Sequence, residues 1–366
     1  SNLSEKSLRQ VTITDLLGRE PIPEKSNLMD KNIRNKTVLV TGAGGSIGSE
    51  LCRQILKTGP IKLILVENSE LALYNIHDQL TRKEPELSKG TEVVPILSSV
   101  RDKIRMCALM KSYKVDTVYH SAAYKHVPLV EMNVIDGVCN NILGTETMVQ
   151  ASIEYHVENF ILISTDKAVR PTNFMGASKR VSELICQAYS KGSTKTIFSM
   201  VRFGNVLGSS GSVLHKFQDQ IKSGGPITVT HRDINRYFMT ISEAVQLVIQ
   251  AGAMSRGGDV FILDMGEPLK IIELAKTLAR INGLNPVEKE ELIKSDYNDN
   301  IEIHITGLRP GEKLFEELLI SQNPSGTEHP RIMTASEKAI TLSLLEKLLT
   351  KIKIFEENRD ISALAR

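Results

Sequence analysis

Short apolar segments alternate with helical patterns between residues 37 and 202, and this rhythm constrains the fold more than any other feature of the sequence. Continuous apolar runs, in place of a strict alternation of polar and apolar residues, are typical of parallel strands buried on both faces. The rhythm therefore predicts an α/β fold with a doubly wound parallel sheet. The runs are TVLVTG (37–42), KLILVE (62–67), EVVPIL (92–97), TVYHSA (117–122), NFILIS (159–164) and IFSMVR (197–202).

The segments between these runs have the periodicity of helices that pack on such a sheet. One follows Ile47, repeats apolar residues every three or four positions, and would end at Gly59-Pro60. Another follows Thr172 and has an apolar stripe that runs from Ala177 to Ala188. Strands and helices therefore alternate, as a doubly wound sheet requires.

The rhythm weakens after residue 204, where Gly and Pro become frequent, and one further apolar run follows at DVFILDMG (259–266). Residues 285–300 are charged and resemble a loop. We therefore expect a smaller, interleaved C-terminal portion beside the sheet domain. The expected parts are a polar N-terminal arm (1–35), the sheet domain (36–204, to which 237–262 return), the smaller portion (205–236 and 263–335) and a helical tail (336–366).

The composition excludes several classes of function. The net charge is +2, Trp is absent and aromatic residues make up 5%, so the chain offers neither a basic surface nor stacking platforms for nucleic acid. No apolar run reaches transmembrane length, and no signal peptide is visible. The four cysteines fall in helical segments without close spacing, which indicates free thiols and no zinc site; they are Cys52, Cys107, Cys139 and Cys186.

The segment VTGAGGSIGSE follows the first expected strand directly and opens the first helix, with glycines at Gly42, Gly45 and Gly48. Glycines at this spacing allow a tight turn and a close approach of the backbone to a pyrophosphate. Backbone N–H groups around Ser46 and Ile47, at the positive end of the helix dipole, would then bind the phosphates. Although a glycine triplet also occurs in ordinary turns, this strand–loop–helix context predicts a dinucleotide site of the Rossmann type.

Two carboxylates bear on which dinucleotide binds. Glu67 ends the second strand, where it can bind the ribose hydroxyls of adenosine and would repel a 2′-phosphate, which favours NAD over NADP. Asp102 follows the third strand and has two interpretations. It could accept a hydrogen bond from the adenine amino group, or it could be the N-cap of the next helix.

Polar side chains follow the fifth expected strand, at the sheet edge where ligands bind in open α/β folds. They are Thr165, Asp166 and Lys167. Met175 and Lys179 lie four residues apart on the next helix, so they share a face. Lys179 could reach the nicotinamide ribose, where its charge would hold the cofactor and lower the pKa of nearby proton donors.

These motifs together resemble a known family. The glycine loop and the position of Lys179 are similar to those of the extended short-chain dehydrogenases/reductases. Over residues 35–335 the chain resembles, within that family, the UDP-N-acetylglucosamine 4,6-dehydratases. The resemblance is closest to the subgroup with Met in place of the catalytic Tyr, here Met175, which retains the configuration at carbon 5 and supplies bacillosamine-type glycan synthesis. The motifs that carry it are HSAAYKHVPLVE (120–131), STDKAV (164–169), RFGNVLGSSGSV (202–213), RYFMTISEA (236–244) and GLRPGEKLFEELL (307–319).

The resemblance implies net loss of water from a UDP-sugar, with NAD as the cofactor. Oxidation at carbon 4 acidifies the carbon 5 proton; a base removes it, an acid protonates the departing carbon 6 hydroxyl, and the hydride returns to carbon 6. We assign Lys167 as the base and Asp166 as the acid, which requires a neutral amine and a protonated carboxyl. Thr165 would hydrogen-bond the carbon 4 hydroxyl. Because Met175 cannot take that hydroxyl's proton, we expect a water held by Thr165 and Asp166 to relay it.

The resemblance also implies substrate and cofactor contacts. Arg309 would bind the phosphates or the uridine ribose, and Glu312 the ribose hydroxyls. Lys125 and His126 would face the sugar, and Asn205 the sugar or the pyrophosphate. Further candidates are Arg236 and His231 for the substrate and Ala122 and Ala123 for the cofactor. We interpret His120 as a core residue, and Asn141 as a residue that stabilises the helix and sheet near the cofactor.

Rival functions come from two classes. An epimerase or a dehydratase that inverts carbon 5 would be another enzyme, but both ordinarily retain Tyr. A dinucleotide-binding sensor without turnover would explain the missing Tyr, but it would not need the Asp166-Lys167 pair.

The cellular setting is also an expectation. The segment VTITDLLGREPI (11–22) resembles the joint to a membrane-spanning region in long relatives. We therefore expect a catalytic domain at the cytoplasmic face of the inner membrane, anchored outside this sequence, or else a cytoplasmic enzyme. A homo-oligomer, dimeric or larger, is expected from the relatives.

Overall fold

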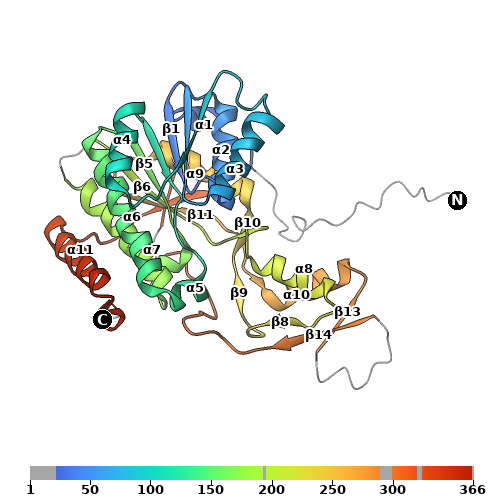
Figure 1. The fold of residues 1–366 in the computed structure, drawn as a ribbon. Helices are drawn as coiled ribbons and strands as arrows, with labels where there is room; N and C mark the ends of the chain where they lie inside the picture. The colour runs from blue at the N-terminus through green and yellow to red at the C-terminus, as the bar shows by residue number, and fades with distance from the viewer. Residues whose placement is uncertain (1–21, 193–194, 289–298, 320–323, 365–366) are drawn as a thin grey trace. The chain divides into compact units, whose positions relative to one another are not determined.

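The computed structural model describes residues 22–192, 195–288, 299–319 and 324–364. The chain divides into two compact units. The larger unit holds residues 23–204, 241–264 and 316–366, and the smaller unit includes residues 205–240 and 265–315. Figure 1 shows the course of the chain.

A sheet of nine strands, counted over the described residues, forms the centre of the larger unit. Its order is β15-β16-β11-β6-β5-β4-β1-β2-β3; all neighbours from β11 to β3 are parallel, and β16 and β15 add antiparallel strands at one edge. Each apolar run named above forms a strand of this sheet, so the predicted doubly wound α/β fold is confirmed. The bounds are β1 Thr37–Thr41, β2 Lys62–Glu67, β3 Glu92–Leu97, β4 Thr117–His120, β5 Asn159–Ile163, β6 Ile197–Arg202, β11 Asp259–Leu263, β15 Ser325–Gly326 and β16 Ile332–Ala335.

Helices cover both faces of the sheet, which is why its central strands are apolar throughout (Figure 1). One face packs on α4 (Lys103–Tyr113), α6 (Val134–Glu154) and α7 (Phe174–Ser190) in one core cluster. Helices α2 (Ser46–Thr58) and α9 (Ile241–Met254) pack together on the other face, with α3 (Glu70–Asp78) beside β2 and β3.

The helix boundaries follow from local sequence signals. Helix α2 ends at Gly59, whose φ of 78° is the left-handed conformation that glycine adopts without strain. Helix α7 begins after Asn173, whose side chain accepts a hydrogen bond from Gly176 N at 2.8 Å. Both helices were predicted from their periodicity.

Residues 26–35, which the sequence placed in a polar arm, belong instead to the core of the larger unit. Helix α1 (Ser26–Asp30) packs against α9, and Leu28, Met29 and Ile33 are buried. The isolated apolar residues of this short segment gave too little periodicity to show it. Residues 1–21 of the expected arm lie outside the described residues.

The smaller unit packs two helices, α8 (Val213–Lys222) and α10 (Ile271–Ile281), with short strands around a core of its own. Strands β7 (Asn205–Leu207) and β10 (Phe238–Thr240) pair in parallel, and β9 (Asn235–Arg236) pairs with β12 (Leu269–Lys270). Strands β13 (Asn285–Glu288), β14 (Asn300–Ile305) and β8 (Ile227–Val229) form a small parallel sheet.

The expectation of a loop over residues 285–300 was wrong at both ends of the segment. Residues 285–288 form β13, although Val287 is the one buried apolar residue in it. Pairing with β14, whose Ile301 and Ile303 are buried, outweighs the low strand propensity of Asn285 and Pro286. Residues 289–298 lie outside the described residues.

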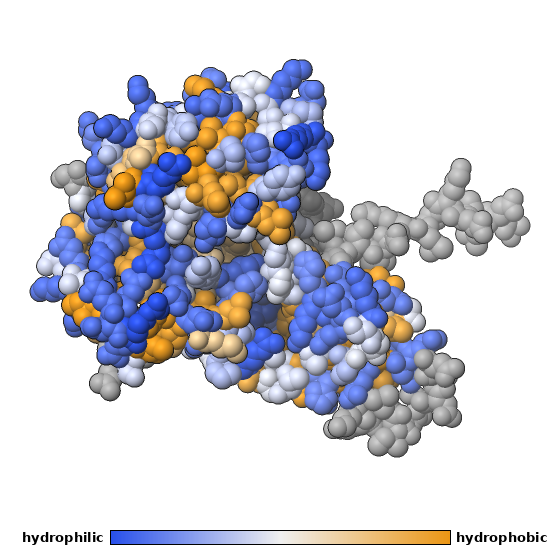
Figure 2. All heavy atoms as spheres, in the orientation of Figure 1, coloured by the Kyte–Doolittle hydropathy of each residue, from blue (hydrophilic) through white to orange (hydrophobic). Residues whose placement is uncertain are grey.

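The chain ends in helices α11 (Leu342–Glu357) and α12 (Ile361–Leu364). Leu345, Leu349 and Ile352 of α11 join the core cluster that contains α6 and α7. All four cysteines are free thiols on helices, as predicted, and Cys107 alone among them is partly exposed. On the face drawn in Figure 2, hydrophilic and hydrophobic residues are interspersed. Over the described residues, no helix has the length and apolarity to cross a membrane.

Candidate active site

The glycine loop joins β1 to α2, and its packing explains two of the three glycines. Gly42 has a φ of 63°, and a Cβ there would lie 2.9 Å from the backbone of Ala122. A Cβ on Gly48 would lie 2.0 Å from the carbonyl oxygen of Gly42. Gly45 caps α2 without a side-chain hydrogen bond, at the positive end of this helix dipole. The loop fits a bound pyrophosphate.

Glu67 holds this loop in place. Its Oε2 accepts a hydrogen bond from Gly44 N at 3.0 Å, and its Oε1 accepts from Asn68 N and Ser69 N at 2.9 and 3.1 Å. The carboxylate is nearly buried at the end of β2. The structure thus gives Glu67 a role in shaping the loop, and its contact with a ribose stays a prediction.

Asp102 shows the second of its two predicted interpretations. Its Oδ1 accepts a hydrogen bond from Arg105 N at 2.9 Å, which makes Asp102 the N-cap of α4. The residue is exposed.

The loop after β4 carries Ala122, Ala123, Lys125 and His126, and buried polar residues hold its start. Thr41 Oγ1 accepts hydrogen bonds from Ser121 N and Ala122 N, both at 3.1 Å. Burial lowers the pKa of Lys125, and burial together with the Lys125 charge lowers the pKa of His126. These two side chains lie on the segment that leads into α5 (Val127–Met132).

Asn141 and His120 act as structural residues, as interpreted from the sequence. Asn141 Oδ1 accepts from Tyr124 N at 2.8 Å, and its Nδ2 donates to Tyr124 O at 3.0 Å and Ser178 Oγ at 2.9 Å. His120 lies between Thr41 and Thr145, at 2.8 and 3.1 Å. Burial, with the nearby Lys179 charge, lowers the pKa of His120 to about 3, so the imidazole is neutral.

Thr165, Asp166 and Lys167 follow β5 at the edge of the sheet, where the sequence placed them. Asp166 is completely buried, and its Oδ1 accepts hydrogen bonds from Thr165 Oγ1 and Lys167 Nζ, both at 2.9 Å. Within the part of the chain that the structure describes, Asp166 Oδ2 is buried without a hydrogen-bond partner. A buried, unpartnered carboxyl oxygen is costly unless it is protonated or meets a ligand.

Helix α7 brings Met175 and Lys179 to the same place. Gly176 lies so close to the Lys167 carbonyl that a Cβ would come within 2.3 Å of the oxygen. Lys179 Nζ donates to Ile163 O, at the end of β5, at 2.6 Å. Burial lowers the pKa of Lys179 to about 8, although the charge of Glu183 opposes this shift. The structure therefore brings four of the predicted catalytic residues, Thr165, Asp166, Lys167 and Lys179, to the end of β5, and Met175 is buried in the first turn of α7.

Glu316 was missed by the sequence analysis, although it lies in the quoted GLRPGEKLFEELL motif. Its Oε1 is 3.6 Å from Lys167 Nζ, and its side chain is 3% exposed. The two residues are far apart in the sequence, so no motif spacing could have predicted their contact. The sequence offered one indication of Glu316: it is a further Glu in the motif from which Arg309 and Glu312 were assigned to the substrate.

A buried ion network behind the site was also missed. Arg202 on β6 donates to both carboxylate oxygens of Glu183 at 2.7 Å, and it pairs with Glu337 at 2.5 and 2.8 Å. Ser164, next to Thr165, donates to Glu183 Oε1 at 2.6 Å. The network thus connects the segment after β5 to α7 and β6.

In the smaller unit, Glu312 brings several predicted substrate residues together. Its carboxylate accepts hydrogen bonds from Thr230 Oγ1 at 3.2 Å and Arg309 N at 3.1 Å, and Arg236 Nη2 lies 3.6 Å away. Asn205 begins β7 and donates its N–H to Tyr237 O at 3.0 Å. His231, a further candidate, accepts from Asp233 N within a turn.

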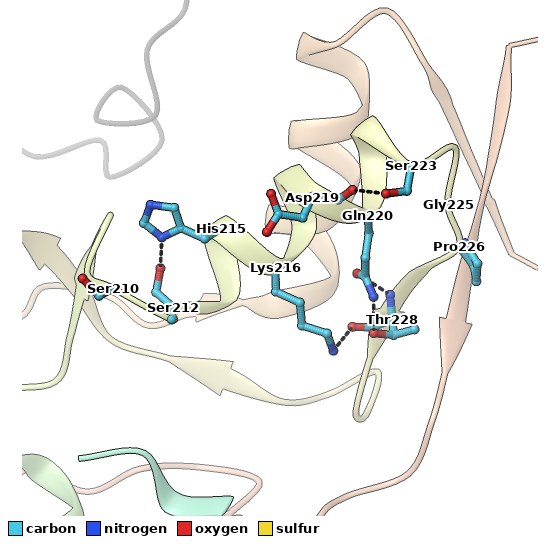
Figure 3. Close-up of a pocket in the computed structure, with 11 residues that line it drawn as sticks. Ser210, Ser212, His215, Lys216, Asp219, Gln220, Ser223, Gly225, Pro226 and Thr228 are labelled. Carbon is cyan, nitrogen blue, oxygen red and sulfur yellow. Dashed lines mark hydrogen bonds between the residues drawn. The ribbon is translucent and has the colours of Figure 1, made fainter. Parts of the chain in front are cut away.

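A groove of about 840 Å³ lies along α8 in the smaller unit (Figure 3). Gln220 Nε2 donates a hydrogen bond to Thr228 Oγ1 at 2.7 Å, and Gln220 Oε1 accepts one from Thr228 N at 3.0 Å. Lys216 Nζ donates to Thr228 O at 3.5 Å. Burial and then the Arg309 charge lower the pKa of Lys216, and Glu312 opposes this, so these charges are neighbours. The sequence analysis missed Lys216 and Gln220; their spacing on one face of a helix after a glycine-rich segment was the available signal.

The residues of the larger unit fit a nicotinamide dinucleotide. The glycines of the loop carry no side chains, so a pyrophosphate could approach the backbone there. Glu67 places a carboxylate beside the loop, and Lys179 supplies a buried amine. Among the described residues, no group of three or more His, Cys, Asp or Glu side chains is placed to hold a metal ion.

Comparison with known proteins gives relatives that are similar in sequence. The capsular polysaccharide biosynthesis protein CapD of Staphylococcus aureus is 49% identical over 317 residues, 87% of this chain and 50% of CapD, so the chain spans half the length of that relative. A UDP-glucose 4-epimerase of Rickettsia rickettsii is 32% identical over 79% of each protein.

A solved structure shares the fold. DesIV, a dTDP-glucose 4,6-dehydratase from Streptomyces venezuelae crystallised with NAD bound, has a TM-score of 0.64 and 19% identity, covering 88% of this chain and 98% of that chain. A family model described as "Polysaccharide biosynthesis protein" matches residues 38–337. The chain therefore belongs to the polysaccharide biosynthesis protein family.

Proposed function

We propose that this chain is an NAD-dependent UDP-N-acetylglucosamine 4,6-dehydratase that retains the configuration at carbon 5. The product would be the UDP-2-acetamido-2,6-dideoxy-hexos-4-ulose used in deoxy-amino-sugar and glycan synthesis. The observation that carries the proposal is the 2.9 Å contact between Lys167 Nζ and the buried Asp166 at the ligand edge of the sheet. Elimination needs one base and one acid side by side, and this pair supplies both.

The cofactor would be held by residues of the larger unit. The glycine loop with Ser46 and Ile47 would bind the pyrophosphate, Glu67 the adenosine ribose, and Lys179 the nicotinamide ribose, with Ala122 and Ala123 against the dinucleotide. When bound, NAD would supply the hydride exchange, accepting from carbon 4 and returning to carbon 6.

The Asp166–Lys167 ion pair contains the protons that dehydration requires. Moving one proton along the 2.9 Å hydrogen bond converts the carboxylate and the ammonium into a carboxylic acid and a neutral amine. The neutral Lys167 then takes the proton from carbon 5. Protonated Asp166 gives its proton to the carbon 6 oxygen, which leaves as water.

After elimination Lys167 is again an ammonium and Asp166 again a carboxylate. When the hydride returns to carbon 6, Lys167 gives a proton to carbon 5, and the proton relayed from the carbon 4 hydroxyl restores the ammonium. Because the ammonium exchanges its protons with solvent, the proton delivered to carbon 5 is a deuteron in deuterated water.

The first proton leaves the carbon 4 hydroxyl, and Met175 cannot accept it. Thr165 Oγ1, bonded to Asp166 Oδ1 at 2.9 Å, would orient that hydroxyl and a relaying water. Loss of a general base costs about 10²–10⁴-fold in rate. We therefore expect a slow first step in an otherwise complete site.

Substrate binding would fall largely to the smaller unit. Arg309, Arg236 and Lys216 are cations for a diphosphate, and Glu312 can accept from ribose hydroxyls. The remaining proposed contacts are Asn205, Lys125 and His126. A membrane anchor outside this sequence, an inner-membrane location and a homo-oligomer stay predictions.

The epimerase relative supports a second candidate, a sugar-nucleotide 4-epimerase. Such an enzyme needs no proton transfer at carbons 5 and 6, whereas the Asp166–Lys167 pair fits that step. Proton NMR of the product separates the candidates. An epimer of the substrate would contradict dehydration, and no turnover with bound NAD would favour a sensor.

The direct test is incubation of the purified protein with UDP-N-acetylglucosamine in deuterated water. We expect a 4-keto-6-deoxy product that carries deuterium at carbon 5. Lys167→Ala should abolish both product formation and exchange at carbon 5, because the base is lost. The exposed Lys191→Ala variant is the matched control and should behave as wild type. Normal turnover by Lys167→Ala would refute the assignment.

A further inference from the structure

Glu316 places a second buried carboxylate beside the lysine of the proposed acid–base pair. Its Oε1 lies 3.6 Å from Lys167 Nζ, and its side chain is 3% exposed. The proposed dehydration uses the carboxyl group of Asp166 and the amine of Lys167, so it assigns no role to Glu316. Burying a carboxylate costs desolvation free energy, so a buried carboxylate beside the proposed catalytic amine suggests a role in the reaction.

Among the described residues, two carboxylates lie in contact with the Lys167 ammonium, those of Asp166 and Glu316. Arg170 is paired with Glu317 at 2.5 Å, and Lys179 Nζ is directed to Ile163 O.

A negative charge at this distance favours the ammonium form of a lysine. The proton shared by Asp166 and Lys167 is therefore biased towards Lys167 as long as Glu316 is ionised. That bias keeps the ion pair intact before substrate binds, and it also sets how readily the amine becomes a base.

We infer that Glu316 is a positioning residue of the dehydration: it orients the Lys167 amine and controls the ionisation of Lys167 through its charge. This inference rests on the proposed function. It assigns Glu316 no contact with substrate and no proton transfer of its own.

The chain provides a matched control in the next residue. Glu317 has the same side chain, but it is 41% exposed and pairs with Arg170. Glu317→Gln therefore removes one negative charge at the same point of the sequence without removing the contact to Lys167.

The first experiment measures the ionisation of Lys167 directly, in the cofactor-free protein. Acetic anhydride acylates neutral amines, so mass spectrometry of Lys167 labelling against pH gives the midpoint of its titration. Glu316→Gln should move that midpoint to lower pH by about one unit or more, because one of two neighbouring negative charges is lost. Glu317→Gln should leave it within a few tenths of a unit of wild type, since exposed charges are well screened.

The second experiment follows the chemistry. In the pH profile of kcat, the acidic limb that reports the neutral base should move to lower pH in Glu316→Gln and stay in place in Glu317→Gln. Glu316→Asp keeps the charge, so it should restore the wild-type limb even if the shorter side chain lowers the rate. A purely structural Glu316 would lower activity at every pH without moving the limb.

The outcomes separate the two proposals. If the wild-type protein forms no 4-keto product, the proposed function fails. If it does and Glu316→Gln matches Glu317→Gln in both the labelling midpoint and the limb, the inference about Glu316 fails and the function stands. Should Glu316→Gln not fold, Glu316→Ala replaces it: a labelling midpoint about one unit or more below wild type supports the inference, and a midpoint equal to that of Glu317→Ala overturns it.

Discussion

At the scale of a residue, Lys179, the proposed ligand of the nicotinamide ribose, is buried at a cost to stability. The amine is 6% exposed, and burial lowers its pKa to about 8 from 10.5. Below about pH 8 the lysine is protonated in both folded and unfolded chains, so the fold bears the full cost of the buried charge. Between these two pKa values the unfolded chain holds a proton that the folded chain has released. Stability from this group therefore rises with pH across that window.

Lys179→Met should for this reason stabilise the cofactor-free protein. We expect the free energy of unfolding near neutral pH to rise by about 1–3 kcal/mol, less whatever is lost with the bond to Ile163 O. The gain should shrink towards about pH 10, where the wild-type lysine is neutral. Urea unfolding of both proteins at the two pH values measures this. A gain that is independent of pH would show that the charge is not its cause.

The positions of single site residues were predictable where the residues directly follow a strand. They were not predictable where the residues come from a distant part of the sequence. Thr165, Asp166 and Lys167 could be placed because an apolar run leads directly to them. Glu316 and the Ser164–Glu183 bond could not, because nothing local distinguishes a buried carboxylate that meets a cation from a solvated one. The choice between the two interpretations of Asp102 likewise needed the geometry of the N-cap.

At the scale of elements, Arg202 connects strand β6 to helix α7 and to the segment that precedes α11. It is completely buried between Glu183 and Glu337. Arg202→Met should cost about 3–5 kcal/mol of stability, because it leaves buried carboxylates without their partner. Arg34→Met, which breaks an exposed pair with Asp30, should leave the stability nearly unchanged. Equal costs in thermal or urea unfolding would contradict the importance of burial.

The elements themselves were largely predictable because their burial is uniform. The strands from β1 to β6 and β11 stood out as continuous apolar runs, and Gly59 and Asn173 provided usable helix ends. Strand β13 was not predictable, since its pairing with β14 provides what its own sequence lacks.

At the scale of the whole molecule, helix α11 completes the core of the larger unit from the far end of the chain. Leu349 is buried against the cluster that contains α6 and α7, whereas Leu344 on the same helix is 55% exposed. Leu349→Ala should lower the free energy of unfolding by about 2–5 kcal/mol. Leu344→Ala should change it by no more than about 0.5 kcal/mol. Comparable effects of the two substitutions would show that the helix is not part of the cooperative fold.

The order of strands along the chain has a consequence for synthesis on the ribosome. Strand β6 pairs with β5 on one side and with β11 on the other, yet the segment 205–240 of the smaller unit is translated between β6 and β11. The nascent chain therefore carries an open, apolar strand edge throughout that interval. A premature stop or a slow stretch of codons within residues 205–258 would leave this edge free to join another chain, and aggregates from such truncated products should form through β6.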